Sequence, residues 1–149
     1  MTDCIRYRLC YDASMRRNIA ALAAVLALCP TVALAAGHEH HERWYQESWC
    51  ASRGEMEVVM PDQSRADCAN ATHVVEFDFG PKWAESIGQA LNYGVQAGKR
   101  PGIVLILEKP SHVRHLRRVL RVRAKYNLPL EIWAVDKDGQ DLQLPKVRR

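Results

Sequence analysis

The sequence predicts a small α/β domain in which a mixed β-sheet is flanked by helices. Two observations carry this prediction. Short runs of alternating or uninterrupted apolar residues predict the strands. Amphipathic segments with a helical period lie between the last three strands and predict helices there. The predicted order is α-β-β-β-α-β-α-β, with antiparallel hairpins first and a parallel crossover after them. A chain of 149 residues has room for one such domain.

Residues 1–35 have the features of a secretory signal peptide. Two arginines follow Met15, an alanine- and leucine-rich run comes next, and the small residues Ala33 and Ala35 fit a cleavage site. The apolar run is too short for a membrane span, so we expect no transmembrane span in the mature chain. The sequence therefore predicts a periplasmic or secreted protein, with Met15 as an alternative start.

The elements of the predicted mature domain, 36–136, follow from local patterns, and 137–149 reads as a polar C-terminal tail. Pro81 suits a first helical turn and Gly98 a helix end, while Ser111 is the expected cap of the last helix. The uninterrupted apolar run GIVLIL is typical of a central strand covered on both faces. The expected helices cover 38–49, 81–97 and 111–126, and the expected strands cover 55–60, 65–68, 73–79, 102–107 and 130–135.

Two of the five cysteines, Cys50 and Cys68, lie beyond the predicted signal peptide. In an exported chain a pair of cysteines most simply forms one disulfide. In the chain-entropy model a loop of this length gains about 3 kcal/mol from closure. Neither cysteine belongs to a CxxC pair, which argues against a zinc site. The bond would tether the segment before the first strand to the strand that carries Asp67.

The segment from Asp67 to Tyr93 holds the candidate functional side chains. Glu76 and Asp78 alternate with apolar residues on the third strand. On the helix that follows, one polar stripe spans roughly 60° and the opposite side is apolar, so we expect the apolar side to be buried. The stripe consists of Lys82, Ser86, Gln89 and Tyr93. The side expected to be buried consists of Trp83, Ile87, Ala90, Leu91 and Val95. The alternative is a solvated edge strand beside a plain amphipathic helix.

This order of elements, with these polar residues on them, resembles the PD-(D/E)xK nuclease superfamily. It is most similar to the RecB-type branch, whose QxxxY motif lies on the helix after the core strands and corresponds here to Gln89 and Tyr93. The resemblance implies a restriction-endonuclease-like fold with Asp67 and Glu76 as metal ligands. The lysine expected two residues after Glu76 is replaced by Asp78, and Lys82 stands where some members carry a migrated lysine.

The resemblance further implies a Mg²⁺- or Mn²⁺-dependent phosphodiester hydrolase that acts on nucleic acid. Asp67, Glu76 and the carbonyl of Phe77 would provide the oxygen ligands that Mg²⁺ prefers, with Asp78 as a third carboxylate. Lys82 would orient a water molecule and stabilise charge, while Gln89 and Tyr93 would support substrate or the lysine. The family's earlier glutamate would be supplied by Glu47, Glu55 or Glu57.

The net charge of +4 is unevenly distributed. Between Lys109 and Tyr126 there are seven basic residues and no acidic one. Within this segment one helical face carries Arg114, Arg118, Arg121 and Lys125. Unrelieved positive charge suits a polyanion such as nucleic acid, lipopolysaccharide or anionic lipid. An inactive exported domain of the same fold that binds an anionic partner is therefore the alternative function.

A third hypothesis concerns copper. Cleavage after Ala35 would leave Ala36, Gly37 and His38 at the new amino terminus. A free amine, two amides and an imidazole in that order bind Cu(II) in a square plane. His40 and His41 lie close by in the sequence.

Overall fold

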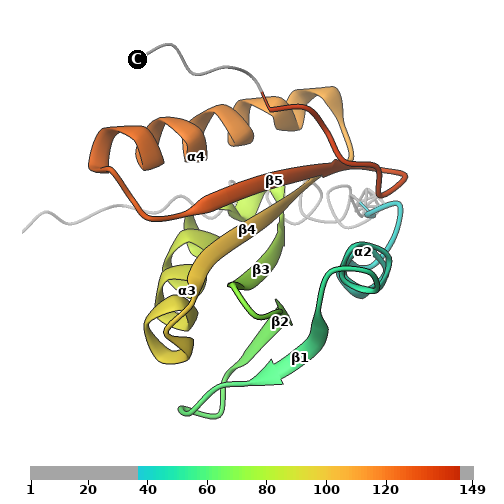
Figure 1. The fold of residues 1–149 in the computed structure, drawn as a ribbon. Helices are drawn as coiled ribbons and strands as arrows, with labels where there is room; N and C mark the ends of the chain where they lie inside the picture. The colour runs from blue at the N-terminus through green and yellow to red at the C-terminus, as the bar shows by residue number, and fades with distance from the viewer. Residues whose placement is uncertain (1–36, 145–149) are drawn as a thin grey trace, which may run out of the picture. The chain divides into compact units, whose positions relative to one another are not determined.

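The computed structural model describes residues 37–144, which form a five-stranded mixed sheet with three α-helices (Figure 1). The predicted α/β class is thereby confirmed, whereas the predicted signal peptide lies outside the described residues. The helices are α2 (Glu42–Cys50), α3 (Trp83–Ala97) and α4 (Val113–Tyr126), and the strands are β1 (Glu55–Val59), β2 (Arg65–Ala69), β3 (His73–Phe79), β4 (Arg100–Leu107) and β5 (Glu131–Asp136).

The strands lie in the sheet in their order along the chain, β1-β2-β3-β4-β5. β1, β2 and β3 form antiparallel neighbours, and β3, β4 and β5 are parallel. The parallel strands are joined through α3 and α4, because a parallel connection needs a crossover. β3 therefore lies at the centre of the sheet, where the antiparallel and the parallel halves meet.

Helices cover both faces of the sheet, and Figure 1 shows α2 and α3 on opposite sides of it. Against α3 and α4, a cluster of aliphatic residues from the two helices packs on Ile103, Leu105 and Ile132. On the other face, Tyr45 and Trp49 of α2 pack on side chains of β3 and β4. The alternation along β3 follows from this division, because neighbouring residues point to opposite faces.

Part of the polar stripe of α3 is buried, and Val95 of the predicted buried side is not. Ser86 and Tyr93 are 0% and 6% exposed, whereas Val95, expected in the core, is 84% exposed. Tyr93 packs with Val74 of β3, whereas Ala90 is in the aliphatic core with Trp83 and Ile87 packed against it, as predicted. The end of the helix agrees with the prediction, since Gly98 ends it with a φ of 61°, whereas Pro81 lies in the 3₁₀ turn Gly80–Lys82 and α3 begins at Trp83.

Helix α4 begins at Val113, not at the expected capping residue Ser111. Ser111 lies in a short 3₁₀ turn, Pro110–His112, and no side chain caps the helix. Asn127 ends the helix in the left-handed conformation, with a φ of 51°, as the sequence predicts.

The structured part of the chain extends past Asp136, the predicted end of the domain. Asp141 forms a bridge with Val135, and Leu142 and Leu144 pack against the aliphatic cluster. Asp141 also accepts hydrogen bonds from Trp49 Nε1 at 3.1 Å and from Arg53 at 2.7 Å. The segment up to Leu144 is therefore part of the domain and not a loose tail.

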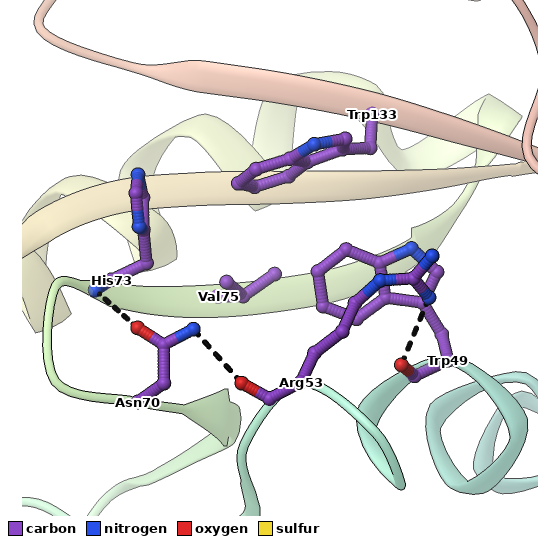
Figure 2. Close-up of a pocket in the computed structure, with 6 residues that line it drawn as sticks. All are labelled: Trp49, Arg53, Asn70, His73, Val75 and Trp133. Carbon is purple, nitrogen blue, oxygen red and sulfur yellow. Dashed lines mark hydrogen bonds between the residues drawn. The ribbon is translucent and has the colours of Figure 1, made fainter.

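A pocket of about 280 Å³ opens on the face of the sheet that carries α2 (Figure 2). Its lining residues come from the end of α2, the turn before β3, and the strands β3 and β5. They are Trp49, Arg53, Asn70, His73, Val75 and Trp133.

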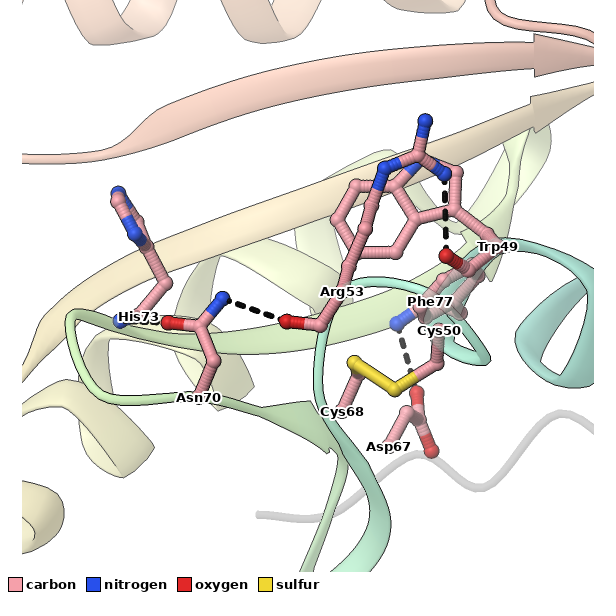
Figure 3. The surroundings of a disulfide bond; sticks show 8 residues. All are labelled: Trp49, Cys50, Arg53, Asp67, Cys68, Asn70, His73 and Phe77. Carbon is pink, nitrogen blue, oxygen red and sulfur yellow. Dashed lines mark hydrogen bonds between the residues drawn. A yellow bond between two sulfur atoms is a disulfide. The ribbon is translucent and has the colours of Figure 1, made fainter.

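The predicted disulfide between Cys50 and Cys68 is present (Figure 3). Its Cα atoms are 6.0 Å apart and both residues are buried, at 0% and 1% exposure. The bond joins the end of α2 to β2, next to Asp67. Among residues 37–144 there is no helix with the length and apolar character needed to cross a membrane.

Candidate functional site

Asp67 and Glu76 meet where β2 and β3 stop pairing. The strands pair at Cys68 and Val75, and the same register continued by one residue places Asp67 opposite Glu76. Instead of a backbone carbonyl, Asp67 Oδ2 accepts the N–H of Phe77 at 2.6 Å (Figure 3). The Asp67 side chain therefore lies between the two strands, on the antiparallel side of β3.

The two carboxylates of β3 are buried. Glu76 is 6% exposed and Asp78 is 3% exposed, and β3 has a neighbouring strand on each side. These observations exclude the alternative of a solvated edge strand. Within residues 37–144, Glu76 Oε2 has no hydrogen-bond partner, which is costly for a buried carboxylate oxygen.

Burial raises the pKa of all three carboxyls, and neighbouring carboxylates add to the rise. Burial, together with the charges of Asp67 and Asp78, raises the pKa of Glu76 to about 9. Burial raises the pKa of Asp67 to about 7, opposed by the N–H of Phe77. Burial raises the pKa of Asp78 to about 7, opposed by Lys82. The cluster therefore has too little positive charge to balance its carboxylates. Either protonation or a bound cation would reduce the repulsion between them.

Glu42, in the first turn of α2, is a member of this cluster that sequence reasoning missed. Burial raises its pKa, and its charge in turn raises the pKa of Asp67, Glu76 and Asp78. Its Oε1 accepts a hydrogen bond of 3.3 Å from the buried Gln46. The sequence signal is the pair of polar residues four apart at the start of an otherwise aromatic helix.

Glu47 and Glu55, two of the glutamates that the sequence predicted as a further metal ligand, are exposed to solvent. Glu47 is exposed and pairs with Arg43 at 2.8 Å, and Glu55 is exposed at the start of β1. The charge of Glu42, in contrast, raises the pKa of Asp67, Glu76 and Asp78.

Glu57 has an unusual backbone conformation directly opposite Asp67. The paired residues of β1 and β2 before and after Glu57 follow a single register. The φ of Glu57 is nevertheless 54°, which is strained for a residue with a side chain. Its carboxylate lies 3.4 Å from Arg65, and its charge raises the pKa of Asp67. Glu57 is close to the site but its carboxylate has another partner.

Lys82 is the cation at the rim of the cluster. Its Nζ lies 3.7 Å from Asp78 Oδ1, and its side chain is 58% exposed. The charge of Asp78 is the main cause that raises the pKa of Lys82, so the side chain remains an ammonium. Asp78 Oδ1 also accepts the N–H of Phe79 at 3.0 Å. The structure thus brings the predicted lysine to the acidic strand.

Gln89 and Tyr93 of α3 differ in what surrounds them. Burial, followed by the charges of Glu76 and Asp67, raises the pKa of Tyr93, which keeps its hydroxyl protonated. Gln89 Oε1 is buried and has no partner among the described residues. Tyr93 is thus linked to the carboxylates by charge, and Gln89 is a half-buried amide with an unpartnered oxygen.

The basic residues of α4 lie on its solvent side. Within residues 37–144 no ion pair joins them to a carboxylate. The amino-terminal end of α4 packs on the turn that carries Lys82, because a Cβ on Gly80 would lie 3.3 Å from His112 Cβ. The exposed members of the predicted face are Arg114, Arg118, Arg121 and Lys125.

His38, the residue of the copper hypothesis, already has partners. Its Nδ1 lies 2.8 Å from Glu108 Oε2, and its ring stacks on Phe79 with centroids 3.5 Å apart. Nδ1 is the nitrogen that closes a chelate ring with the histidine's own amide, so Cu(II) would have to displace Glu108. Glu108 also accepts the N–H of Glu39 at 2.8 Å and the hydroxyl of Tyr45 at 3.1 Å.

In the described part of the chain no group of three or more His, Cys, Asp or Glu side chains is arranged to hold a metal ion. Mg²⁺ needs fewer protein ligands than that, since one or two carboxylates with water and substrate phosphate suffice. The pair of Asp67 and Glu76 fits this smaller requirement, because one buried oxygen of Glu76 lacks a partner.

Comparison of the chain with models of protein families, with curated proteins and with solved structures finds no match.

Proposed function

We propose that the protein is a divalent-metal-dependent phosphodiester hydrolase that acts on nucleic acid. The observation that carries the proposal is the junction of β2 and β3. There, the half-buried Asp67 and the buried Glu76 meet from adjacent strands, and one oxygen of Glu76 lacks a partner; the exposed Lys82 pairs with Asp78 of the same strand. The order α2-β1-β2-β3-α3-β4, with Glu42 on the first helix, supports a restriction-endonuclease-like core.

The electrostatics of the cluster favour a bound cation. Burial raises the pKa of four carboxyls, Glu42 included, and Lys82 is the basic residue that opposes this rise for Asp78. A buried carboxylate without a counter-charge costs free energy, and either protonation or a bound divalent cation removes that cost. Asp67, Glu76 and the carbonyl of Phe77 would hold Mg²⁺ or Mn²⁺, and the bound ion would polarise a phosphoryl oxygen and acidify water.

The charge state of Lys82 indicates which part it would play in the proposed hydrolysis. Because Asp78 raises its pKa, Lys82 remains protonated and is unsuited to accept a proton from water. Its ammonium instead stabilises negative charge on phosphoryl oxygens as they gain charge in the transition state. Tyr93 stays protonated as well, so its hydroxyl can donate a hydrogen bond to substrate or to a ligand carboxylate.

Helix α4 supplies a surface for the polyanion. Its amino-terminal end packs on the turn that carries Lys82, and its basic side chains have no carboxylate partner in the described residues. A nucleic acid backbone that reaches the cluster can therefore continue along α4, where Lys and Arg neutralise phosphates.

We also propose export of the protein to an oxidising compartment. The buried disulfide between Cys50 and Cys68 supports this, because such bonds persist outside the reducing cytosol. Extracellular or incoming nucleic acid would then be the substrate.

The test combines metal binding with cleavage. Calorimetric titration of the purified, oxidised protein with Mn²⁺, beside plasmid nicking in Mg²⁺, should show binding and nicking by the wild type. Asp67→Asn and Glu76→Gln should each lose at least about a hundredfold in nicking rate, as expected when a metal ligand is removed. Glu55→Gln, an exposed glutamate on β1, is the matched control and should behave as the wild type. Wild-type protein that neither binds Mn²⁺ nor nicks DNA would refute the proposal.

The same assay tests Glu42 against Glu47, since both lie on α2 and Glu47 is exposed. Glu42→Gln should reduce nicking about tenfold or more, because removal of a residue that supports metal ligands typically costs that much. Glu47→Gln should have no effect. Equal effects of the two substitutions would remove Glu42 from the site.

A second candidate function is an inactive exported domain that binds an anionic partner through α4. The absence of carboxylate partners for the basic residues of α4 among residues 37–144 favours it. In that case nucleic acid or anionic lipid would bind equally well to wild type and to Asp67→Asn, with no cleavage in either.

A further inference from the structure

The pocket on the α2 face is built mainly from aromatic rings (Figure 2). Trp133 of β5 is half-buried and meets Trp49 and His73 edge-on, with ring centroids 5.4 and 5.6 Å apart. No described ring stacks flat on Trp133. The pocket therefore has an indole face that no aromatic side chain of the described residues covers.

The backbone beneath Trp133 makes room for this ring. A Cβ on Gly102 would lie 2.5 Å from Trp133 Cζ3, a distance that real atoms do not tolerate. Glycine at this position lets the indole lie against β4, and Val75 of the neighbouring strand lies 3.3 Å from the same point. The ring is thus held in one place by backbone contact, as a preformed stacking surface requires.

Among the polar groups of the pocket, the hydrogen-bond acceptors already have partners within the protein, whereas some donors are free. Asn70 Oδ1 accepts from the N–H groups of Thr72 and His73 and from the Thr72 hydroxyl. Both ring nitrogens of His73 are engaged, one by Thr72 and the other by Glu131 at 2.8 Å. The Asn70 side-chain NH₂ donates one hydrogen bond to the carbonyl of Arg53, and its second N–H is free.

Arg53 adds further donors and a positive charge. Its guanidinium lies 4.5 Å from the Trp49 ring centroid and donates to the carbonyl of Trp49 and to Asp141. A guanidinium has five N–H donors, so others remain free. The pocket therefore suits a flat ligand whose edge carries hydrogen-bond acceptors, and it suits a polyol or an amine poorly.

We propose that this pocket binds a nucleobase, either of a free nucleotide or of a nucleic acid strand. A planar ring can stack on Trp133, and its carbonyl and ring-nitrogen acceptors can meet the free donors of Arg53 and Asn70. The volume of about 280 Å³ lies at the lower end of the range for small-molecule sites, as a single base requires. The site does not depend on the acidic cluster and stands whether or not that cluster cleaves phosphodiesters.

Binding is measured on the full oxidised protein in EDTA, so that metal-dependent contacts at the acidic cluster play no part. The probes are dTMP, dAMP and an oligothymidylate, titrated by calorimetry with tryptophan fluorescence alongside. Trp133→Leu should weaken binding about tenfold or more, because that is the scale of losing a base–aromatic stack. Trp133→Phe should retain most of the affinity. Trp83→Leu, which removes a half-buried tryptophan on the opposite face, is the matched control and should bind as the wild type.

Circular dichroism melts show whether the variants fold. If Trp133→Leu does not, Asn70→Asp replaces a donor by an acceptor at the pocket edge and should weaken binding by about fivefold or more. A much tighter complex with the oligonucleotide than with dTMP assigns the site to a strand, and equal affinities assign it to a free nucleotide. Wild type that binds no probe at millimolar concentration, or folded Trp133→Leu and Asn70→Asp that both bind normally, overturns the proposal.

Discussion

The carboxylate of Asp67 accepts the backbone N–H of Phe77 at 2.6 Å and so occupies a place that a strand carbonyl normally takes. This contact holds Asp67 beside Glu76 at the centre of the sheet, where both carboxyls are shielded from water. Two acids held together in this way have consequences for stability as well as for the proposed chemistry.

The first prediction concerns the pH dependence of stability without metal. Burial and neighbouring charge raise the folded-state pKa of Glu76 from 4.5 to about 9, so folding favours the protonated form. The stability that this proton contributes is complete below about pH 4.5 and is lost as the pH rises toward 9. In EDTA, the free energy of unfolding should therefore fall between pH 5 and pH 9 by about 1 kcal/mol or more.

Urea titrations at a series of pH values provide the measurement. Glu76→Gln should make the fall smaller, because glutamine does not titrate, and Asp67 and Asp78, whose pKa values are also raised, account for the part that remains. The exposed Glu55→Gln should leave the curve unchanged. Addition of Mn²⁺ should raise stability more at high pH than at low pH, since the cation competes with protons. A wild-type curve that rises from pH 5 to pH 9 would contradict the prediction.

Reduction of the disulfide should destabilise the domain. Cys50 and Cys68 are separated by 18 residues in sequence, and a loop of that size contributes about 3 kcal/mol in the chain-entropy model. Thermal melts of Cys50→Ala/Cys68→Ala should show a Tm lower by about 10 °C or more. Mn²⁺ affinity should fall too, because Asp67 adjoins Cys68. An unchanged Tm would mean that the bond adds no net stability.

Lys82 should matter for rate and not for stability. Its side chain is exposed, so Lys82→Met should leave the Tm within about 1–2 °C of the wild type, as surface substitutions usually do. The nicking rate should fall about a hundredfold, the typical effect of removing one group that stabilises transition-state charge. Lys82→Arg should keep part of the rate, and Lys99→Met, at the far end of α3, should keep all of it. A loss of nicking in Lys99→Met equal to that in Lys82→Met would point to nonspecific charge effects.

The basic face of α4 should determine the salt dependence of nucleic acid binding. Replacement of Arg114, Arg118 and Arg121 by Gln should reduce the slope of log K against log salt by about 0.9 for each phosphate that the helix no longer neutralises. Filter binding at several salt concentrations gives the slope. Arg43→Gln, an exposed arginine on α2, should leave the slope unchanged. If Arg43 and the α4 residues have equal effects, the polyanion does not bind preferentially to α4.

Local patterns in the sequence predicted most of the strands and helices within a few residues. Pro81 and Gly98 indicated the ends of α3, because proline fixes a first-turn φ and glycine accepts the left-handed conformation. The start of α4 was missed, since Ser111 has a capping side chain but lies in a 3₁₀ turn. Capping preferences describe what a residue favours locally, and the turn after Pro110 outweighs that preference here.

The sequence alone determined the class of fold, the disulfide partners and the polar residues of β3 and α3, because periodicity and residue type carry that information. Only the tertiary structure decided that Ser86 and Tyr93 of the polar stripe are buried and that Val95 is exposed. It also placed Glu42 where its charge acts on Asp67 and Glu76, and it brought Trp133 to Trp49. These pairs lie far apart in the chain, and strand order and register, which no local pattern encodes, bring them together.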